Sequence, residues 1–248
     1  MSQLPQESRI FAETIPSRSW EDSPKRTLQS IDLWKIYIPA YLHKMDQLFD
    51  LLSPDEKYRA ARYHQRKDKN RLVIGRGMLR KILSFYINCP PGEIEFRKGI
   101  NGKPYMHQPF LMQFNLSYSY NYIIIGVASE AIGVDVEYIN PTFDYDLMLD
   151  ACFMESEIQA ITSSSESRQQ FFKFWTRKEA LLKATALGLG DYLTEFSCLD
   201  GSQPLPPNLA TEGSWLVESF MLDHAYWISI ATKSPCSYRF INATTLFE

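Results

Sequence analysis

Two acidic residues stand one residue apart in a short apolar run, Gly133-Val134-Asp135-Val136-Glu137. Side chains alternate along a strand, so Asp135 and Glu137 would lie on one face and the two valines on the other. Carboxylates arranged in this way can share a hard cation such as Mg²⁺, which prefers oxygen ligands and commonly binds substrate phosphates as well. The same alternation also fits a solvated strand face, so the pair does not by itself establish a site.

A second group lies between Phe174 and Lys183, in the sequence FWTRKEALLK. Glu179 and Lys183 are four residues apart and would share one face of a helix. On a helix surface such a pair is an ordinary ion pair that contributes only about 0.3 to 0.5 kcal/mol. The occurrence of both groups in one chain, an acidic strand followed by this helix, favours a functional site.

The elements that would carry these groups can be predicted from the surrounding pattern. The ranges 122–129 and 132–138 read as strands joined so closely that we expect a hairpin. The helix with Glu179 is expected from about Arg168 to Leu187. Further elements are expected as a helical region from about residue 145 and as strands near residues 215, 225 and 238.

The first half of the chain places basic residues on predicted helices. A first strand is expected over 31–38. A helix should begin at Ser53, because a proline follows it and Glu56 can complete a capping box. The range 68–86 has an apolar stripe with arginines largely off it, which predicts an amphipathic helix with a basic side. A short strand is expected over 94–96.

Composition excludes several classes of protein. With 45% hydrophobic and 22% charged residues among 248, the chain has the profile of a folded globular protein. Its net charge of −3 gives no general attraction to nucleic acid, so any anion site must be local. The four cysteines are far apart and form no zinc or disulfide pattern.

The organisation predicted along the chain is an N-terminal arm followed by two halves. Residues 1–29 are polar, carry three prolines and lack periodicity, so we expect a mobile arm or an extended wrapping segment. The halves are expected at 30–128 and 129–248. No apolar run is long enough to cross a bilayer and no secretory signal is evident, so we expect a cytoplasmic protein without membrane contact.

The acidic strand and the downstream helix together resemble two signatures of the Sfp-type 4′-phosphopantetheinyl transferase family. These signatures are a G-[IV]-D-x-E strand and a W-x-x-K-E-x-x-x-K helix, and both occur here in order. The resemblance extends through Gly102-Lys103-Pro104 and Phe114-Asn115-Leu116-Ser117 and covers about residues 50 to 190. It implies an α+β fold of two similar α/β subdomains related by pseudo-twofold symmetry, with the active site in the cleft between them.

The resemblance also implies an activity. Members transfer the 4′-phosphopantetheine arm of coenzyme A to a serine of an apo acyl or peptidyl carrier protein, and release adenosine 3′,5′-bisphosphate. We therefore expect a Mg²⁺-dependent enzyme of the holo-[acyl-carrier-protein] synthase type. It would be a monomer that serves fatty-acid, polyketide or nonribosomal-peptide biosynthesis.

Residue by residue, the resemblance assigns roles at the expected site. Asp135, Glu137 and Glu179 match the magnesium ligands, and Glu179 also matches the candidate general base. Lys183 matches a catalytic phosphate contact, with Lys178 beside the same site. The residues that match or could support a coenzyme A site are Lys57, Arg59, Arg71, Arg97, Lys103, Asn115, Leu116, Ser117, Tyr118, Lys178 and Lys183.

One position departs from the family pattern. The family commonly has Ser-His-Ser where this chain has Ser117-Tyr118-Ser119. A phenol can stack or donate a hydrogen bond, but it supplies no cation near neutral pH. Coenzyme A affinity or its pH dependence is therefore expected to differ.

Two other functions compete with the transferase. Tyr118 would also suit a noncatalytic module that binds coenzyme A or a carrier protein, although the three acids and Lys183 are all retained. The basic helices between residues 57 and 81 suggest nucleic-acid binding, but the net charge and the lack of a recognised binding module oppose it.

Overall fold

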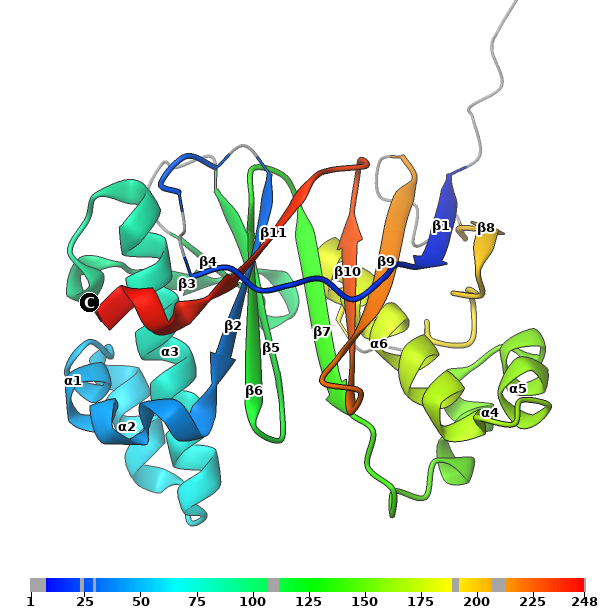
Figure 1. The fold of residues 1–248 in the computed structure, drawn as a ribbon, viewed down its shortest axis with the longest axis horizontal. Coiled ribbons are helices and arrows are strands. Elements are labelled where there is room, and N and C mark those ends of the chain that lie inside the picture. Colours follow the sequence, from blue (N-terminus) through cyan, green and yellow to red (C-terminus); the bar gives the residue numbers. More distant parts are fainter. Residues whose placement is uncertain are drawn as a thin grey trace, which may run out of the picture. The chain divides into compact units, whose positions relative to one another are not determined.

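The computed structural model describes residues 8–22, 25–28, 30–106, 112–188, 192–206 and 213–247. The fold is α+β, and the chain divides into two compact units (Figure 1). Unit 1 comprises residues 1–18 and 130–236, and unit 2 comprises residues 19–129 and 237–248. Residues 237–248, which the sequence placed in the second half, thus cluster with the first.

Unit 2 is built on a four-stranded sheet with the order β11-β2-β6-β5. The long helix α3 packs its apolar side against this sheet, and its Leu79 and Ile82 join Trp34 and Ile125 in one buried core. The strands are β2 (Ile31–Tyr37), β3 (Phe96–Lys98), β4 (Pro104–Met106), β5 (Gln113–Ser119), β6 (Tyr122–Ala128) and β11 (Tyr238–Asn242). The α-helices are α1 (Met45–Asp50), α2 (Pro54–Arg62) and α3 (Arg66–Ile87), with 3-10 turns at Ile38–Lys44, Pro91–Glu93, Ile100–Gly102 and Ala243–Phe247.

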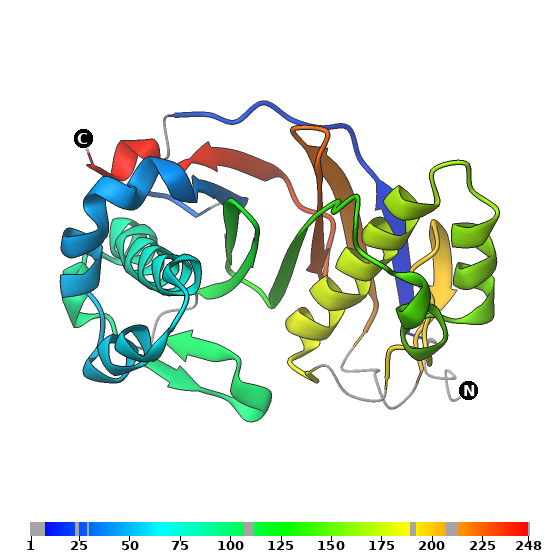
Figure 2. The ribbon, with the colours of Figure 1, turned by 90° about the horizontal axis from the view of Figure 1, so that it is seen from below.

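Unit 1 is built on a five-stranded sheet with the order β7-β10-β9-β1-β8. Helix α6 lies along this sheet and packs against β7, β10 and β9 (Figure 2). The strands are β1 (Arg9–Thr14), β7 (Ile132–Tyr138), β8 (Gly201–Pro204), β9 (Trp215–Leu222) and β10 (Tyr226–Thr232). The helices are α4 (Leu149–Cys152), α5 (Glu155–Thr162) and α6 (Ser167–Thr185), with a 3-10 turn at Asp146–Met148.

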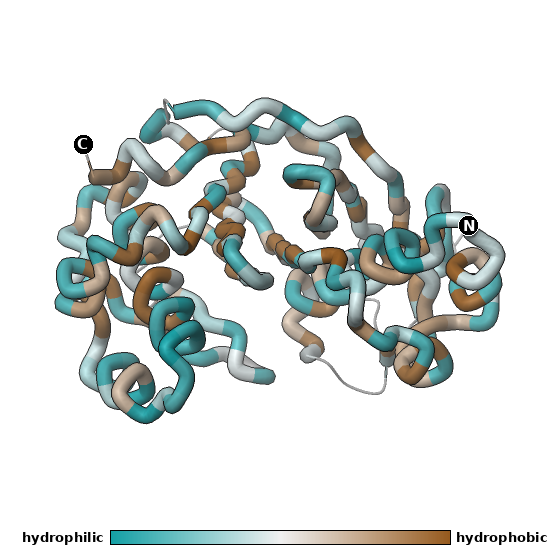
Figure 3. The backbone as a smooth tube through the Cα atoms, turned by 60° about the horizontal axis from the view of Figure 1, so that its bottom comes forward, coloured by the Kyte–Doolittle hydropathy of each residue, from teal (hydrophilic) through white to brown (hydrophobic). Residues whose placement is uncertain are grey.

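Hydropathy accounts for both cores. Hydrophobic residues predominate along strands such as β6 and β9, which are largely buried, while helices alternate between hydrophobic and hydrophilic residues (Figure 3). Helix α2 begins as predicted, with Ser53 accepting a hydrogen bond from the Glu56 backbone and Glu56 closing the capping box. Within the described ranges, no helix has the length and apolar character needed to span a membrane.

The predicted hairpin between residues 122–129 and 132–138 is wrong. The first strand, β6, pairs with β2 and β5, whereas the acidic strand β7 pairs with β10 in the other unit. The hairpin partner of β6 is β5, and Tyr120 in the connecting turn has a positive φ of 48°. The short strand expected at 94–96 lies slightly later, at β3.

The N-terminal arm contains a paired strand, which fits an extended packed segment better than a mobile arm. Residues 9–14 form strand β1, which lies between β9 and β8 in the sheet of unit 1. Further along the arm, the backbone of Glu21 makes hydrogen bonds to Phe240 and Asn242. Residues 1–7, 23–24 and 29 of this segment lie outside the described residues. Ile10 and Ala12 are buried, so this strand is part of the core of unit 1.

Candidate functional site

The acidic strand turns its carboxylates toward α6. Gly133, Asp135 and Glu137 share one face of β7 by alternation. A Cβ atom on Gly133 would lie 1.9 Å from the Ala180 carbonyl oxygen and 2.5 Å from the Ala184 backbone nitrogen. No side chain fits there, so the glycine allows α6 to approach the strand at backbone distance. The helix can then set its own side chains beside the acids.

Lys183 connects the helix to the acidic strand. Its Nζ atom donates a hydrogen bond to Asp135 Oδ1 at 2.6 Å. Burial lowers the pKa of Lys183, but the charges of three carboxylates outweigh burial and raise it. These carboxylates are Asp135, Glu179 and Glu137. The ammonium group is therefore the electrostatic centre of the acidic cluster.

Glu179 is a carboxyl group with an unusual proton affinity. It is 6% exposed, and burial, followed by the negative charge of Asp135, raises its pKa to about 7. Lys183 acts in the opposite direction and lowers it. A carboxyl group with a pKa near the working pH has the property expected of a general base.

The donor chemistry of the cluster suits a hard cation. Asp135, Glu137 and Glu179 offer oxygen ligands from two elements, which are the ligands that Mg²⁺ prefers. Across the described part of the chain, however, no three His, Cys, Asp or Glu side chains are gathered tightly enough to hold a metal ion. In this arrangement one Asp135 oxygen accepts the hydrogen bond from Lys183.

Lys178 does not belong to this cluster, contrary to the prediction. Its side chain is fully buried, and Nζ forms an ion pair with Glu157 at 2.8 Å. The same nitrogen donates hydrogen bonds to the carbonyl oxygens of Leu193 and Phe196. Adjacent residues on a helix point in different directions, and Lys178, next to Glu179, points into the protein interior. In this structure the Lys178 side chain therefore joins α6 to Glu157 and to the segment after α6.

Unit 2 contains a separate cavity with basic walls. It has a volume of about 440 Å³ and is bounded by α2, α3 and the segments around β3 and β4. Two predicted coenzyme A residues, Arg59 and Arg97, line it. Three further basic residues line the cavity without having been predicted: Arg76, Arg80 and Lys98. The signal for the two arginines was present as the basic side of the helix at 68–86, but only the fold showed that they face the cavity together with Lys98 of β3.

Glu56 holds two of these arginines in place. Its carboxylate lies 2.8 Å from Arg80 Nη1 and 3.6 Å from Arg76 Nε. Burial lowers the pKa of both guanidinium groups, and Glu56 partly offsets this. Glu56 therefore caps α2 and also holds two of the arginines that line the cavity.

Other predicted residues of unit 2 have different surroundings. Lys57 donates a hydrogen bond from Nζ to the Asp50 carbonyl oxygen at 3.2 Å, beside the end of α1, and is not among the lining residues of the cavity. Arg71 stacks its guanidinium on the ring of Tyr118, 4.5 Å from its centroid. The tyrosine that replaces the usual histidine thus contacts another predicted ligand residue.

Lys103 and the segment Asn115-Leu116-Ser117 complete the predicted set. Burial lowers the pKa of Lys103 to about 8, and the cavity is lined by its neighbours Gly102 and Pro104.

The segment Asn115-Leu116-Ser117 is part of strand β5, so its side chains alternate. Leu116 packs toward the core that includes α3, and Asn115 and Ser117 point to the other face of the sheet. The three residues therefore do not line one surface.

Comparison with known proteins identifies the class of this chain. Residues 131–231 match the family model described as the 4′-phosphopantetheinyl transferase superfamily, and residues 39–131 match the 4′-phosphopantetheinyl transferase, N-terminal, model. The chain belongs to the 4′-phosphopantetheinyl transferase superfamily. Members of this superfamily transfer phosphopantetheine to carrier proteins, and this transferase is an enzyme of that class.

Individual relatives agree with the family match. The transferase is 36% identical over 174 residues to 4′-phosphopantetheinyl transferase HetI of Nostoc sp., covering 67% of this chain and 73% of the relative. It is 29% identical to psf-1 of Bacillus pumilus, over 82% of this chain and 88% of that protein. It is 24% identical to Sfp of Bacillus subtilis, over 82% and 92%.

Proposed function

We propose that this transferase moves the 4′-phosphopantetheine arm of coenzyme A to a serine hydroxyl of an apo acyl or peptidyl carrier protein, with Mg²⁺ bound by Asp135, Glu137 and Glu179. The observation that carries the proposal is the close contact of α6 with β7 at Gly133. Through it, Lys183 reaches Asp135 and interacts with the charges of the other two acids.

The proposed reaction divides the work among these residues. The serine oxygen forms a bond to the phosphorus that carries the pantetheine arm, and the pyrophosphate bond to adenosine 3′,5′-bisphosphate breaks. Glu179 accepts the serine proton, directly or through a water molecule. Lys183 stabilises negative charge on the phosphate oxygens. A bound magnesium ion supplies further neutralisation of the departing phosphate.

We assign the coenzyme A phosphates to the basic residues of unit 2. Arg59 and Arg97 line the basic cavity, and Lys103 is next to two residues that line it. Guanidinium groups can hold phosphate oxygens with paired hydrogen bonds, which suits them to this task. Arg71 and Tyr118 form a stacked pair that can contribute to the same ligand.

A mass measurement tests the function. The protein is mixed with coenzyme A, magnesium and an apo carrier protein, and the carrier is weighed by mass spectrometry. A phosphopantetheine mass gain is expected, and its loss is expected when EDTA replaces magnesium. Binding of coenzyme A without mass gain on several carriers would instead support the noncatalytic alternative.

One variant and a matched control test the assigned cluster. Asp135→Ala should reduce the rate of mass gain by at least about a hundredfold, because it removes a proposed metal ligand and the partner of Lys183. Asp144→Ala removes an exposed aspartate from the same unit and should leave the rate unchanged. Equal rates for the two variants would contradict the assignment.

A further inference from the structure

A line of hydroxyl groups crosses the sheet of unit 1 in register with Asp135. Ser229 on β10 is directly opposite Asp135, and Ser219 on β9 is directly opposite Ser229. Thr14 on β1 is the register partner of Ser219. We call Ser229, Ser219 and Thr14 the hydroxyl row. Because directly opposite residues share a face of a sheet, the row continues the face that carries Asp135 toward α6.

Helix α6 is hydrogen-bonded to every member of this row. The Thr176 hydroxyl lies 2.8 Å from the Ser229 hydroxyl. Arg177 donates from Nε to the Ser219 hydroxyl at 2.9 Å and from Nη2 to the Thr14 hydroxyl at 3.1 Å. The Ser219 and Ser229 hydroxyls also lie 2.9 Å apart. The row and the helix thus form one connected polar network.

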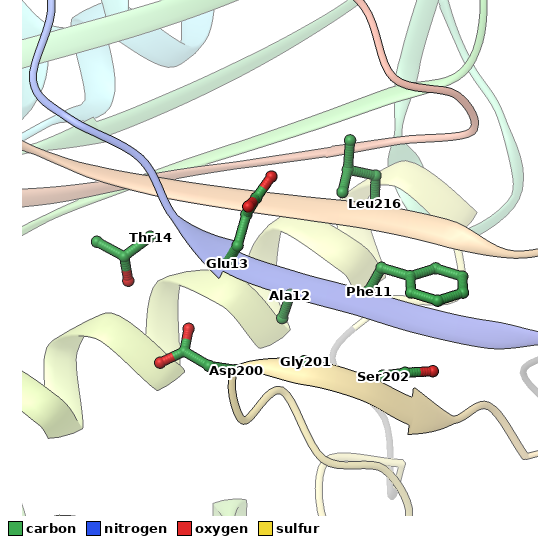
Figure 4. Close-up of a pocket in the computed structure, with 8 residues that line it drawn as sticks. All are labelled: Phe11, Ala12, Glu13, Thr14, Asp200, Gly201, Ser202 and Leu216. Atoms are coloured by element: carbon green, nitrogen blue, oxygen red, sulfur yellow. The ribbon is translucent and has the colours of Figure 1, made fainter.

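Arg177 is the rigid part of the network. Its side chain is completely buried, and Nη2 also forms an ion pair with Asp200 at 2.7 Å, while Nη1 donates to the Cys198 carbonyl oxygen at 2.8 Å. In Figure 4, Thr14 lies at the end of β1 beside Asp200, and Glu13 points to the opposite side of the strand. A planar guanidinium that donates to fixed acceptors on several elements allows little movement of the helix that carries it.

Buried hydroxyl groups are an unusual choice for the contact between a helix and a sheet. Apolar side chains would fill the same space without requiring fixed hydrogen-bond geometry, and a buried polar group costs free energy unless it finds its partner. Hydrogen bonds, unlike apolar contacts, are satisfied at only one position of the helix. Arg177 and Thr176 precede Glu179 by only two and three residues, so any shift of the row would move Glu179 as well.

We propose that the hydroxyl row is a positioning device for α6, which sets the place where the helix presents Glu179 and Lys183 to the acidic strand. The inference rests on the roles proposed above for these two residues. It gives a function to the N-terminal strand β1, which supplies Thr14 and precedes both regions matched by the family models, residues 39–131 and 131–231. Thr14, Ser219 and Ser229 are positioning residues, since they act through α6.

Thr14→Val is the main test. Valine keeps the β-branched shape and removes the oxygen that accepts the Arg177 hydrogen bond. We expect the kcat of phosphopantetheine transfer to fall about tenfold, because small displacements of catalytic groups reduce rates strongly, with the KM for coenzyme A within about twofold. Thr14→Ser restores the acceptor and should recover most of kcat. Rates are measured well below the thermal transition, with circular dichroism confirming the fold.

A control on the same N-terminal segment distinguishes positioning of α6 by Thr14 from a general effect of attaching this segment to the sheet. The Ser17 hydroxyl donates to the Met221 carbonyl oxygen at 2.7 Å and is outside the row. Ser17→Ala should leave kcat unchanged. If Ser17→Ala lowers kcat as much as Thr14→Val does, or if Thr14→Val lowers only the thermal transition and not kcat, the proposal is overturned.

Two further variants complete the design. If Thr14→Val does not fold, Ser219→Ala is judged by the same kcat and KM criteria, because it removes the acceptor of Arg177 Nε. Asp135→Ala is assayed in parallel. Full activity of Asp135→Ala would contradict the proposed catalytic cluster, whereas an inactive Asp135→Ala with a normal Thr14→Val would overturn the hydroxyl row alone.

Discussion

In the acidic cluster the pKa values of both Glu179 and Lys183 are raised, with different consequences for the two groups. Burial and the neighbouring Asp135 charge raise the pKa of Glu179 to about 7, so it can take up and release a proton near neutral pH. The surrounding acids raise the pKa of Lys183, so its ammonium group keeps its proton. The same cluster thus offers a proton acceptor and a permanent cation one helical turn apart.

Lys103 predicts a pH dependence of coenzyme A use. Burial lowers its pKa to about 8, so the ammonium group loses its charge as the pH rises through this value. The kcat/KM for coenzyme A reports groups of the free enzyme and should therefore fall above pH about 8. Lys103→Arg keeps a cation at higher pH and should move the fall upward. A wild-type profile that stays level from pH 7 to 9.5 would exclude Lys103 as a phosphate contact.

Lys178 predicts a loss of stability without a loss of substrate affinity. Its ion pair with Glu157 is completely buried, so Lys178→Ala leaves a buried carboxylate without its cation. We expect the free energy of unfolding in urea to fall by about 3 to 5 kcal/mol. Because the Lys178 ammonium group is bound to Glu157 and two carbonyl oxygens in the protein interior, the KM for coenzyme A should remain within about twofold. If Lys178→Ala is fully folded and its KM for coenzyme A is much higher, Lys178 is a coenzyme A contact as first predicted.

The contact between α6 and β7 is the element on which the candidate site depends. Gly133 has no room for a Cβ atom, whereas a Cβ atom on Gly92 meets nothing within 4 Å. Gly133→Ala must push the helix away from the acidic strand. We expect a loss of about 1 to 3 kcal/mol in stability from overpacking.

The same substitution should affect activity more than stability. A displacement of α6 moves Glu179 and Lys183 from Asp135, and we expect kcat to fall by about a hundredfold. Gly92→Ala is the matched control for stability and should leave the unfolding midpoint unchanged, and the exposed-site variant Asp144→Ala is the control for kcat. Retention of wild-type kcat by Gly133→Ala would show that the close approach of α6 is not required.

At the scale of the whole molecule, the chain does not form its units from contiguous halves. It passes between them near residues 18, 129 and 236. The C-terminal strand β11 pairs in parallel with β2 in unit 2. There Arg239 contacts the fully buried Asp32 through Nε at 2.7 Å and anchors it. Unit 2 therefore requires residues from the end of the chain.

This arrangement predicts that residues 30–128 alone do not form a stable domain. The fragment lacks β11 and leaves the buried Asp32 without Arg239. We expect no cooperative thermal transition for the fragment by circular dichroism. In the full chain, Arg239→Ala should cost about 3 to 5 kcal/mol of stability, and Arg239→Lys less. A fragment that unfolds cooperatively would contradict the role of β11.

Local features of this protein could be read from its sequence because they depend on residues a few positions apart. The capping box of Ser53 and Glu56, the alternation of Asp135 and Glu137 on a strand, and the shared helix face of Glu179 and Lys183 are of this kind. The order of the two signatures was enough to indicate the family, and the family models confirm it.

The tertiary structure decided everything that depends on distant residues. Alternation showed that β7 is a strand but could not show that it pairs with β10 rather than β6, because both partners are apolar and the correct one is far along the chain. Helical spacing placed Lys178 beside Glu179, but only the packing of α5 and of the segment that follows α6 buried its ammonium group. Thr14 acquired a role for the same reason: strand pairing brought the polar arm to Arg177.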